Sequence, residues 1–74
     1  MPNKYYIVVY QDSGVKHYSE KFTSLQQIMD FYIINNECIE EDIQYFNEMG
    51  SQYFCNGFLK ALGLQVMEYQ TGGN

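Results

Sequence analysis

The chain contains no arginine and no tryptophan, and only one proline, one histidine and two cysteines. Without arginine, four lysines carry all the positive side-chain charge. That is too little to neutralise a run of phosphates, so we expect no direct binding to nucleic acid. Two cysteines are too few for a disulfide framework. No apolar run approaches the ~20 residues that cross a membrane, and the N-terminal residues do not form a secretion signal. A reduced, cytoplasmic protein with no membrane contact is expected.

Reactive side chains are scattered along the sequence rather than clustered. His17 falls in a segment of strand character with no nucleophile motif around it. Glu40, Glu41 and Asp42 are consecutive, and adjacent side chains on a helix point about 100° apart, so they cannot hold one metal ion together. The glycines lack the spacing of a phosphate-binding loop. We therefore expect no enzyme activity, no metal site and no cofactor.

Aromatic residues are abundant, with eight tyrosines and five phenylalanines among the 74 residues. A chain of this size buries only about 60% of the surface it exposes when unfolded, so its core must come from large side chains. The hydrophobic fraction of 46% is too high for a disordered chain. We expect one compact domain over residues 1–70 and a flexible C-terminal tail over residues 71–74.

Three segments have the composition of β-strands. Residues 5–10 are aromatic or β-branched and apolar on both faces, which is typical of a central strand. A turn over residues 11–14 leads to a second strand over residues 15–21, whose lysines favour an edge position. Residues 64–69 form a third strand. The pattern predicts an antiparallel sheet in the order 2-1-3.

Three helices are expected between the second and third strands. The first begins at Thr23 or Ser24, each of which stands three residues before a glutamine, as in a capping box. The second spans roughly residues 37–49, and the third roughly residues 51–62. The fold class is therefore α+β, in the order β-β-α-α-α-β, with the helices on one face of the sheet. The expected core residues are Ile7, Val9, Leu25, Ile28, Met29, Tyr32, Ile43, Phe46, Phe54 and Phe58. Further apolar positions expected to face inward are Phe31, Ile34, Ile39 and Leu62.

Charge of one sign is concentrated in the middle of the chain. The net charge is −5, and residues 22–59 include no basic residue. The acidic residues of this stretch are Asp30, Glu37, Glu40, Glu41, Asp42 and Glu48. They either form a solvated helix face that keeps an aromatic-rich protein in solution, or a contact surface for a basic partner. Both interpretations stay open.

The tyrosines suggest a second contact surface. Tyr6 and Tyr10 lie on the same side of the first strand, and Tyr18 and Tyr69 could join them. If the helices cover the side of Ile7, these tyrosines form an exposed aromatic patch of the kind found in binding hot spots. The alternative is a half-buried rim that needs no partner.

In format, the chain resembles small acidic inhibitor proteins encoded by phages, including anti-CRISPR and host-takeover proteins. The resemblance lies in a short acidic chain with a two-stranded start, residues 5–10 and 15–21, and a capped helix over residues 22–32. It implies a cytoplasmic protein, in the host cell, that occupies a functional surface of another protein, such as one that binds nucleic acid. These inhibitors share no diagnostic motif, so no functional residue follows from the resemblance.

The sequence thus predicts a non-enzymatic protein-binding module whose partner has a basic surface. A homo-oligomeric structural or regulatory protein, such as a homodimer, and a DNA mimic are the alternatives. The candidate partner-binding residues are Tyr6, Tyr10, Tyr18, Glu37, Glu40, Glu41, Asp42 and Glu48.

Overall fold

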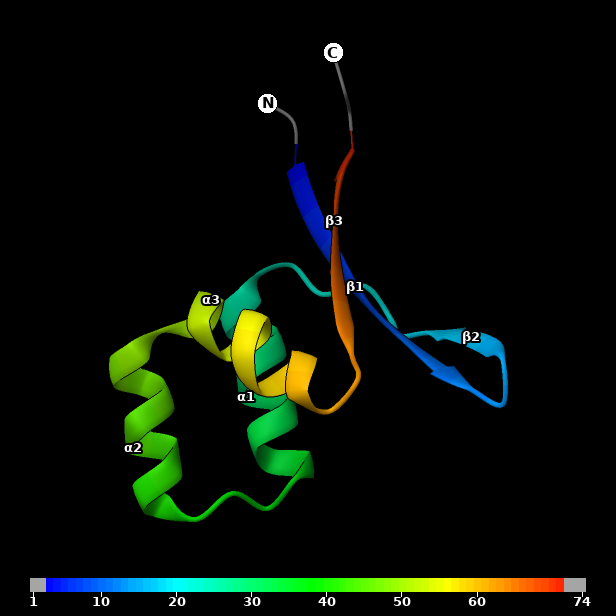
Figure 1. The fold of residues 1–74 in the computed structure, drawn as a ribbon. Coiled ribbons are helices and arrows are strands. Elements are labelled where there is room, and N and C mark those ends of the chain that lie inside the picture. The colour runs from blue at the N-terminus through cyan, green and yellow to red at the C-terminus, as the bar shows by residue number, and fades with distance from the viewer. Residues whose placement is uncertain (1–2, 72–74) are drawn as a thin grey trace.

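A computed structural model describes residues 3–71 and has the expected α+β fold (Figure 1). The sheet is antiparallel in the order β2-β1-β3, as predicted. The elements are β1 Asn3–Asp12, β2 Val15–Tyr18, α1 Leu25–Asn35, α2 Glu40–Met49, α3 Ser51–Tyr53, the π-helix η1 Phe54–Leu59, and β3 Gln65–Thr71. The predicted tail began at residue 71, but Thr71 belongs to β3, and residues 72–74 lie outside the described part of the chain.

β1 and β2 form a hairpin with a tight turn. Ser13 and Gly14 both have positive φ angles, 52° and 82°, as in the two-residue turns that match the twist of a hairpin. β2 ends at Tyr18, earlier than predicted, and the chain leaves the ladder. It returns at Phe22, which exchanges two backbone hydrogen bonds of 2.8 Å with Tyr6.

Helix α1 begins at the predicted cap. The Ser24 hydroxyl accepts a 3.1 Å hydrogen bond from the backbone N–H of Gln27, which satisfies one of the free donors of the first turn. The buried residues of α1 are Ile28, Met29 and Ile33. Phe31 and Ile34, expected to widen the buried stripe, are exposed, because only a narrow side of α1 contacts the rest of the molecule.

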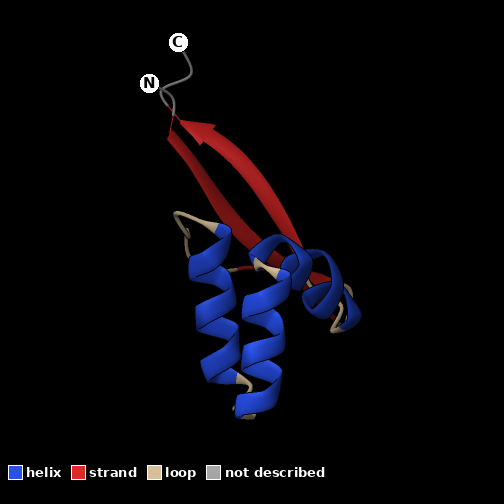
Figure 2. Cartoon of the chain, turned by 90° about the vertical axis from the view of Figure 1, so that its left-hand side faces the viewer, coloured by secondary structure: helices blue, strands red, loops and turns tan. Residues whose placement is uncertain are grey.

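Helix α2 starts later than predicted and does not cover the sheet. Glu37 has a φ of 50° and lies in the connection, so the helix begins at Glu40. Ile39, expected inside, is exposed. α2 lies on the side of the helical layer farthest from the strands (Figures 1 and 2), and its buried Phe46 packs edge-on against Phe54 and Phe58. Within the layer of helices on this face of the sheet, α2 therefore packs on the neighbouring helices.

The third helix changes its winding after one turn. Phe54 and Leu59, five residues apart, are both fully buried. In the α-helical phase Leu62 would follow Phe54 and Phe58 inward, but Leu62 is 51% exposed. In a π-helix, backbone hydrogen bonds join residues five positions apart. This wider winding turns Leu59, instead of Leu62, toward the core.

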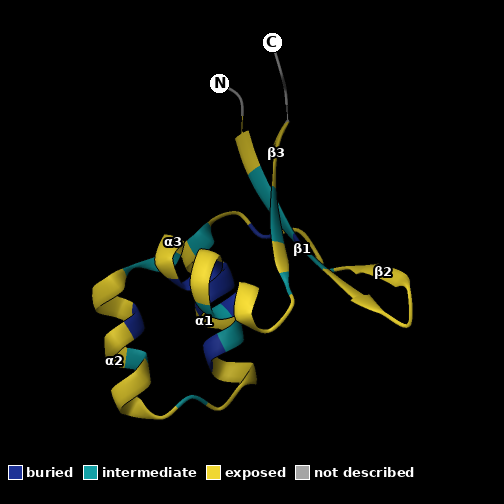
Figure 3. Ribbon diagram, viewed as in Figure 1, coloured by how far each residue is buried: buried dark blue, intermediate teal, exposed yellow. Residues whose placement is uncertain are grey.

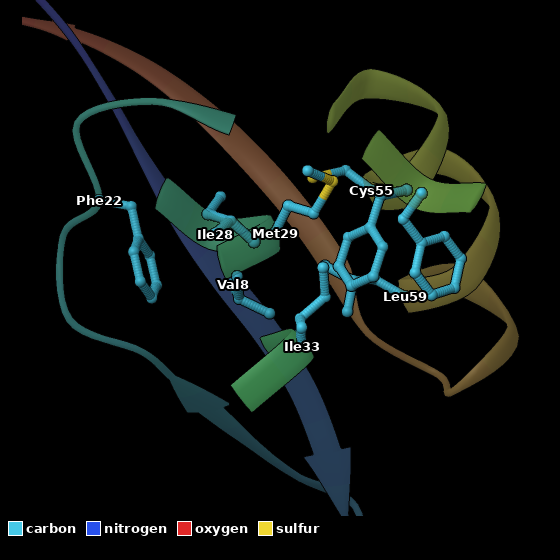
Figure 4. Packing of buried hydrophobic residues seen from close by; sticks show 9 residues of the cluster. Val8, Phe22, Ile28, Met29, Ile33, Cys55 and Leu59 are labelled. Atoms are coloured by element: carbon cyan, nitrogen blue, oxygen red, sulfur yellow. The ribbon is translucent and has the colours of Figure 1, made fainter. Parts of the chain in front are cut away.

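The core lies between the helical layer and one face of the sheet (Figures 3 and 4). Val8, on that face, has 0% exposure. Ile7 and Val9 were predicted in the core, yet they are only half-buried and lie on the other face, because side chains alternate along a strand. The buried residues are Val8, Phe22, Ile28, Met29, Ile33, Phe46, Phe54, Cys55 and Leu59. The remaining predicted core residues, half-buried against this cluster, are Leu25, Tyr32, Ile43 and Phe58.

The molecule is thin because only one face of the sheet is covered. Its extents are 42 × 35 × 17 Å. The paired ends of β1 and β3 project past the helices on one side, and the β1–β2 turn projects on the other (Figures 1 and 2).

Candidate functional site

The register of the sheet assigns each strand residue to a face. Residues directly opposite each other in antiparallel strands lie on the same face. Tyr6 pairs with Glu68, and Val8 with Val66; these four belong to the face that the helices cover. The opposite face, called the open face below, is formed by the intervening residues. Its apolar and aromatic members are Tyr5, Ile7, Val9, Tyr18, Met67 and Tyr69.

The aromatic rings of the open face are already organised. Tyr5 and Tyr69 stack across the strands, with ring centroids 5.2 Å apart and 13° between their planes. Lys21, in the segment after β2, places its Nζ 4.8 Å from the centroid of the Tyr5 ring, a cation–π contact. Two tyrosines are therefore held in place before any partner arrives.

A hollow open to solvent lies on the same face, toward the β1–β2 turn. Val9, Tyr18 and Met67 line it, and its polar rim includes Gln11, Lys16 and Gln65. Lys16 lines the hollow and Lys21 lies over the Tyr5 ring, so positive charge accompanies this face. The open face therefore combines apolar, aromatic and positively charged groups.

The predicted tyrosine patch was assigned to the wrong face. Tyr6 lies under the helices and packs against the core. Tyr10 shares its face, but it is 42% exposed and stacks on His17 at a centroid distance of 4.9 Å. Tyr18 and Tyr69 do lie on the open face, where Tyr18 is 62% exposed.

Tyr5, Ile7, Val9 and Met67 were not predicted as members of a contact face. Since β1 is apolar on both sides, its periodicity gives no signal for the face that the helices choose.

The predicted acidic residues lie on the helical layer. Glu40, Glu41 and Asp42 occupy the first turn of α2, where negative charge is favoured by the helix dipole. Glu37 precedes the helix, and Glu48 lies near its end. These five residues, called the acidic surface below, are all exposed. They are carried by the element farthest from the sheet (Figure 1).

A second exposed aromatic pair lies on the helices. The hydroxyl oxygens of Tyr45 and Tyr53 are 3.0 Å apart, and this hydrogen bond raises the pKa of Tyr45. Met49, one turn after Tyr45, is also exposed. This group is smaller than the open face and belongs to α2 and α3.

The histidine and the two cysteines lie on different parts of the fold, with His17 on β2, Cys38 before α2 and Cys55 on η1. His17 is exposed and contacts Tyr10. Cys38 and Cys55 are both free thiols, and burial raises the pKa of Cys55 to about 11, so its reactive thiolate is scarce at neutral pH. Among residues 3–71, His, Cys, Asp and Glu side chains form no group of three or more that could hold a metal ion. No described helix has the length and apolar character needed to cross a membrane.

No protein-family model matches the chain, and neither a curated protein nor a solved structure matches it.

Proposed function

We propose that the protein is a non-catalytic binding module that attaches to another protein through its open face and acts by occupying that protein's surface. One observation carries the proposal: the sheet has a single layer of helices, and its uncovered face is aromatic and apolar. An antiparallel sheet with one face in water normally alternates apolar and polar residues. Here Tyr5, Ile7 and Val9 of β1 are apolar or aromatic and half-buried on the uncovered face.

The composition of the open face supports a protein partner. Tyrosine provides large contact area at a low cost in side-chain entropy, and tyrosine and methionine are both enriched at protein interfaces. Lys16 and Lys21 accompany them. The partner surface that fits is apolar at its centre, with carboxylates at its rim.

The acidic surface favours a second candidate, a contact with a basic partner surface. All five of its residues are exposed, and the net charge of the protein is −5. At low salt, this negative charge attracts a basic surface over a long distance. In this version, the protein covers a basic surface such as one that binds nucleic acid, as a DNA mimic would. Because the acidic surface and the open face belong to different layers, one flat partner surface contacts one or the other.

The two candidates are separated by matched variants in a capture experiment from the native host's lysate. Tyr18→Ser with Met67→Ser alters the open face, whereas Tyr45→Ser with Met49→Ser removes the same residue types from α2. Glu40→Gln, Glu41→Gln and Asp42→Asn neutralise three of the five residues of the acidic surface. Circular dichroism establishes that each variant is folded.

If the open face binds the partner, the unmodified protein, the α2 variant and the acidic variant should all capture the same protein, and the open-face variant should not. Loss of the captured protein with the acidic variant alone would support the second candidate. Equal capture by all the folded variants would contradict both. Self-association through the open face, the homo-oligomeric alternative, would appear as a change in sedimentation of the open-face variant without any partner.

A further inference from the structure

The two edges of the sheet are built differently. At the β2 edge the strand has four residues and includes Lys16. Beyond it, the Ser19 hydroxyl accepts the Val8 N–H at 2.8 Å, and the chain bulges before it returns at Phe22. Short length, lysine and a bulge are the devices by which proteins prevent a strand edge from pairing with another chain.

The β3 edge has none of these devices. β3 spans seven residues, Gln65–Thr71, without lysine or proline, and within the described part of the chain it pairs with β1 alone. Its second half projects beyond the helical layer (Figures 1 and 2). An antiparallel strand of this length offers an edge of roughly 24 Å, since each residue advances the strand by about 3.4 Å.

We propose that β3 pairs antiparallel with β3 of a second copy of this chain. The two sheets would join across a two-fold axis into one continuous sheet in the order β2-β1-β3-β3-β1-β2. This inference concerns the edge of the sheet, so it is independent of the function proposed for the open face.

The sequence of β3 is self-complementary in this arrangement. In the register centred on Glu68, Met67 lies opposite Tyr69 of the other copy, and the same pair forms again across the axis. Both residues belong to the open face, where apolar and aromatic cross-strand pairs stabilise a sheet. Val66 lies opposite Gln70. A strand of another protein would need side chains that match Met67 and Tyr69, whereas a second copy of β3 already has them.

The charges permit the pairing. Glu68 would face its own copy, but its carboxylate lies 3.5 Å from the Lys4 ammonium within each molecule, which reduces the repulsion. The acidic surface is on α2, away from β3 (Figure 1). Since each copy carries a net charge of −5, the dimer should strengthen as salt screens the long-range repulsion. One strand edge buries little area, so a dissociation constant in the micromolar range or weaker is expected.

A single engineered cysteine tests the arrangement. Residues directly opposite in antiparallel strands have Cα atoms about 4.5–5.5 Å apart, within the range of a disulfide. Glu68→Cys in a Cys38→Ser background places one thiol on the axis, and losing the exposed ion pair with Lys4 costs little. Lys16→Cys in the same background is the matched control at the β2 edge. Mild oxidation should give a covalent dimer far faster for the variant at position 68.

Sedimentation and hydrogen exchange of the unmodified protein provide the second measurement. We expect a monomer–dimer equilibrium that shifts to dimer with salt, and slower exchange of β3 amides at high protein concentration. A protein that remains monomeric up to about 1 mM, corresponding to about 4 kcal/mol of binding free energy or less, overturns the proposal. A dimer whose cysteines cross-link equally fast at positions 68 and 16 also overturns it, because that dimer would use another surface.

Discussion

Val8 and Ile7 are neighbours in the chain and lie on opposite faces of β1, so the same substitution should have different costs at the two positions. Threonine has nearly the shape of valine but adds a hydroxyl. At Val8, which has 0% exposure, Val8→Thr should lower the free energy of unfolding by about 1–3 kcal/mol, because the hydroxyl loses its hydrogen bonds with water.

Ile7→Thr is the comparison on the open face, and it also shortens the side chain by one carbon. Water reaches this side chain, so the cost should stay below about 1 kcal/mol. Urea unfolding followed by circular dichroism measures both variants. If Ile7→Thr proves the more costly of the two, the helices cover the other face of the sheet.

Cys55 should make the stability of the protein sensitive to alkaline pH. Burial raises the pKa of its thiol from 9.0 to about 11. The unfolded chain therefore loses this proton first, which favours unfolding. The contribution of Cys55 to stability is fully present below about pH 9 and declines as pH rises toward 11.

In Cys55→Ala this part of the pH dependence should be absent. Subtracting its urea midpoints from those of the unmodified protein, between pH 7 and pH 11, isolates the thiol from the tyrosines that ionise in the same range. Parallel curves for the two proteins would mean that the thiol is not buried in solution.

At the scale of single residues, the sequence predicts which segments are apolar but not which side of β1 faces inward. Tyr5, Ile7 and Val9 are as suitable for a core as Tyr6, Val8 and Tyr10. The face is decided by contacts with distant residues, such as the two hydrogen bonds between Tyr6 and Phe22. Only tertiary structure contains that information, so the candidate site could not be placed from the strand alone.

The helical elements show where local rules hold and where they fail. The cap at Ser24 follows from the Ser24–Gln27 spacing and was predicted correctly. The π-helix was not predicted. With α-helical spacing, Leu62 is expected to lie on the same buried side as Phe54, whereas in the structure Leu59 is buried and Leu62 is exposed. No residue type specifies a π turn by itself, and the close packing of Phe54 on Phe46 and Phe58 accompanies it.

Two glycines at this end of the molecule should respond to alanine in opposite ways. Gly57 lies inside η1, and a Cβ atom there would meet nothing within 4 Å. Gly57→Ala should therefore raise stability by about 0.4–1 kcal/mol, because alanine restricts the unfolded chain. Gly63 has a φ of 83°, a left-handed conformation in which Gly63→Ala should cost about 1–2 kcal/mol.

Thermal unfolding of the two variants gives the comparison directly. A loss of stability in Gly57→Ala would indicate that the π-helix needs the flexibility of glycine. The substitution would then be a tool to test whether η1 changes shape during binding.

For the whole molecule, the excess of negative charge lies in the helical layer. The acidic surface is there, whereas in and beside the sheet Lys4, Lys16 and Lys21 balance Asp12, Glu20 and Glu68. The acidic surface would attract a basic partner electrostatically before the two proteins touch. This attraction weakens as the Debye length falls from ~10 Å at 0.1 M salt to ~3 Å at 1 M.

Neutralising Glu40, Glu41 and Asp42 with Gln, Gln and Asn should therefore reduce the association rate with a basic partner more than it raises the dissociation rate. The salt dependence should also become flatter. Surface plasmon resonance against the captured partner measures both rates. An unchanged association rate and salt slope would show that these carboxylates serve only solubility.

The pairing of β1 with β3 has a consequence for the order in which the protein folds. The central strand, at the start of the chain, makes its longest ladder with the last strand, and Asn3 faces Thr71. The β1–β2 hairpin and the helices join residues that are close in the sequence, whereas β1 and β3 are far apart. Until β3 pairs, Val8 has no strand neighbour on that side. Because closing so long a loop is slow, we expect this ladder to form last, so a refolding chain should stay susceptible to proteases until β3 has paired with β1.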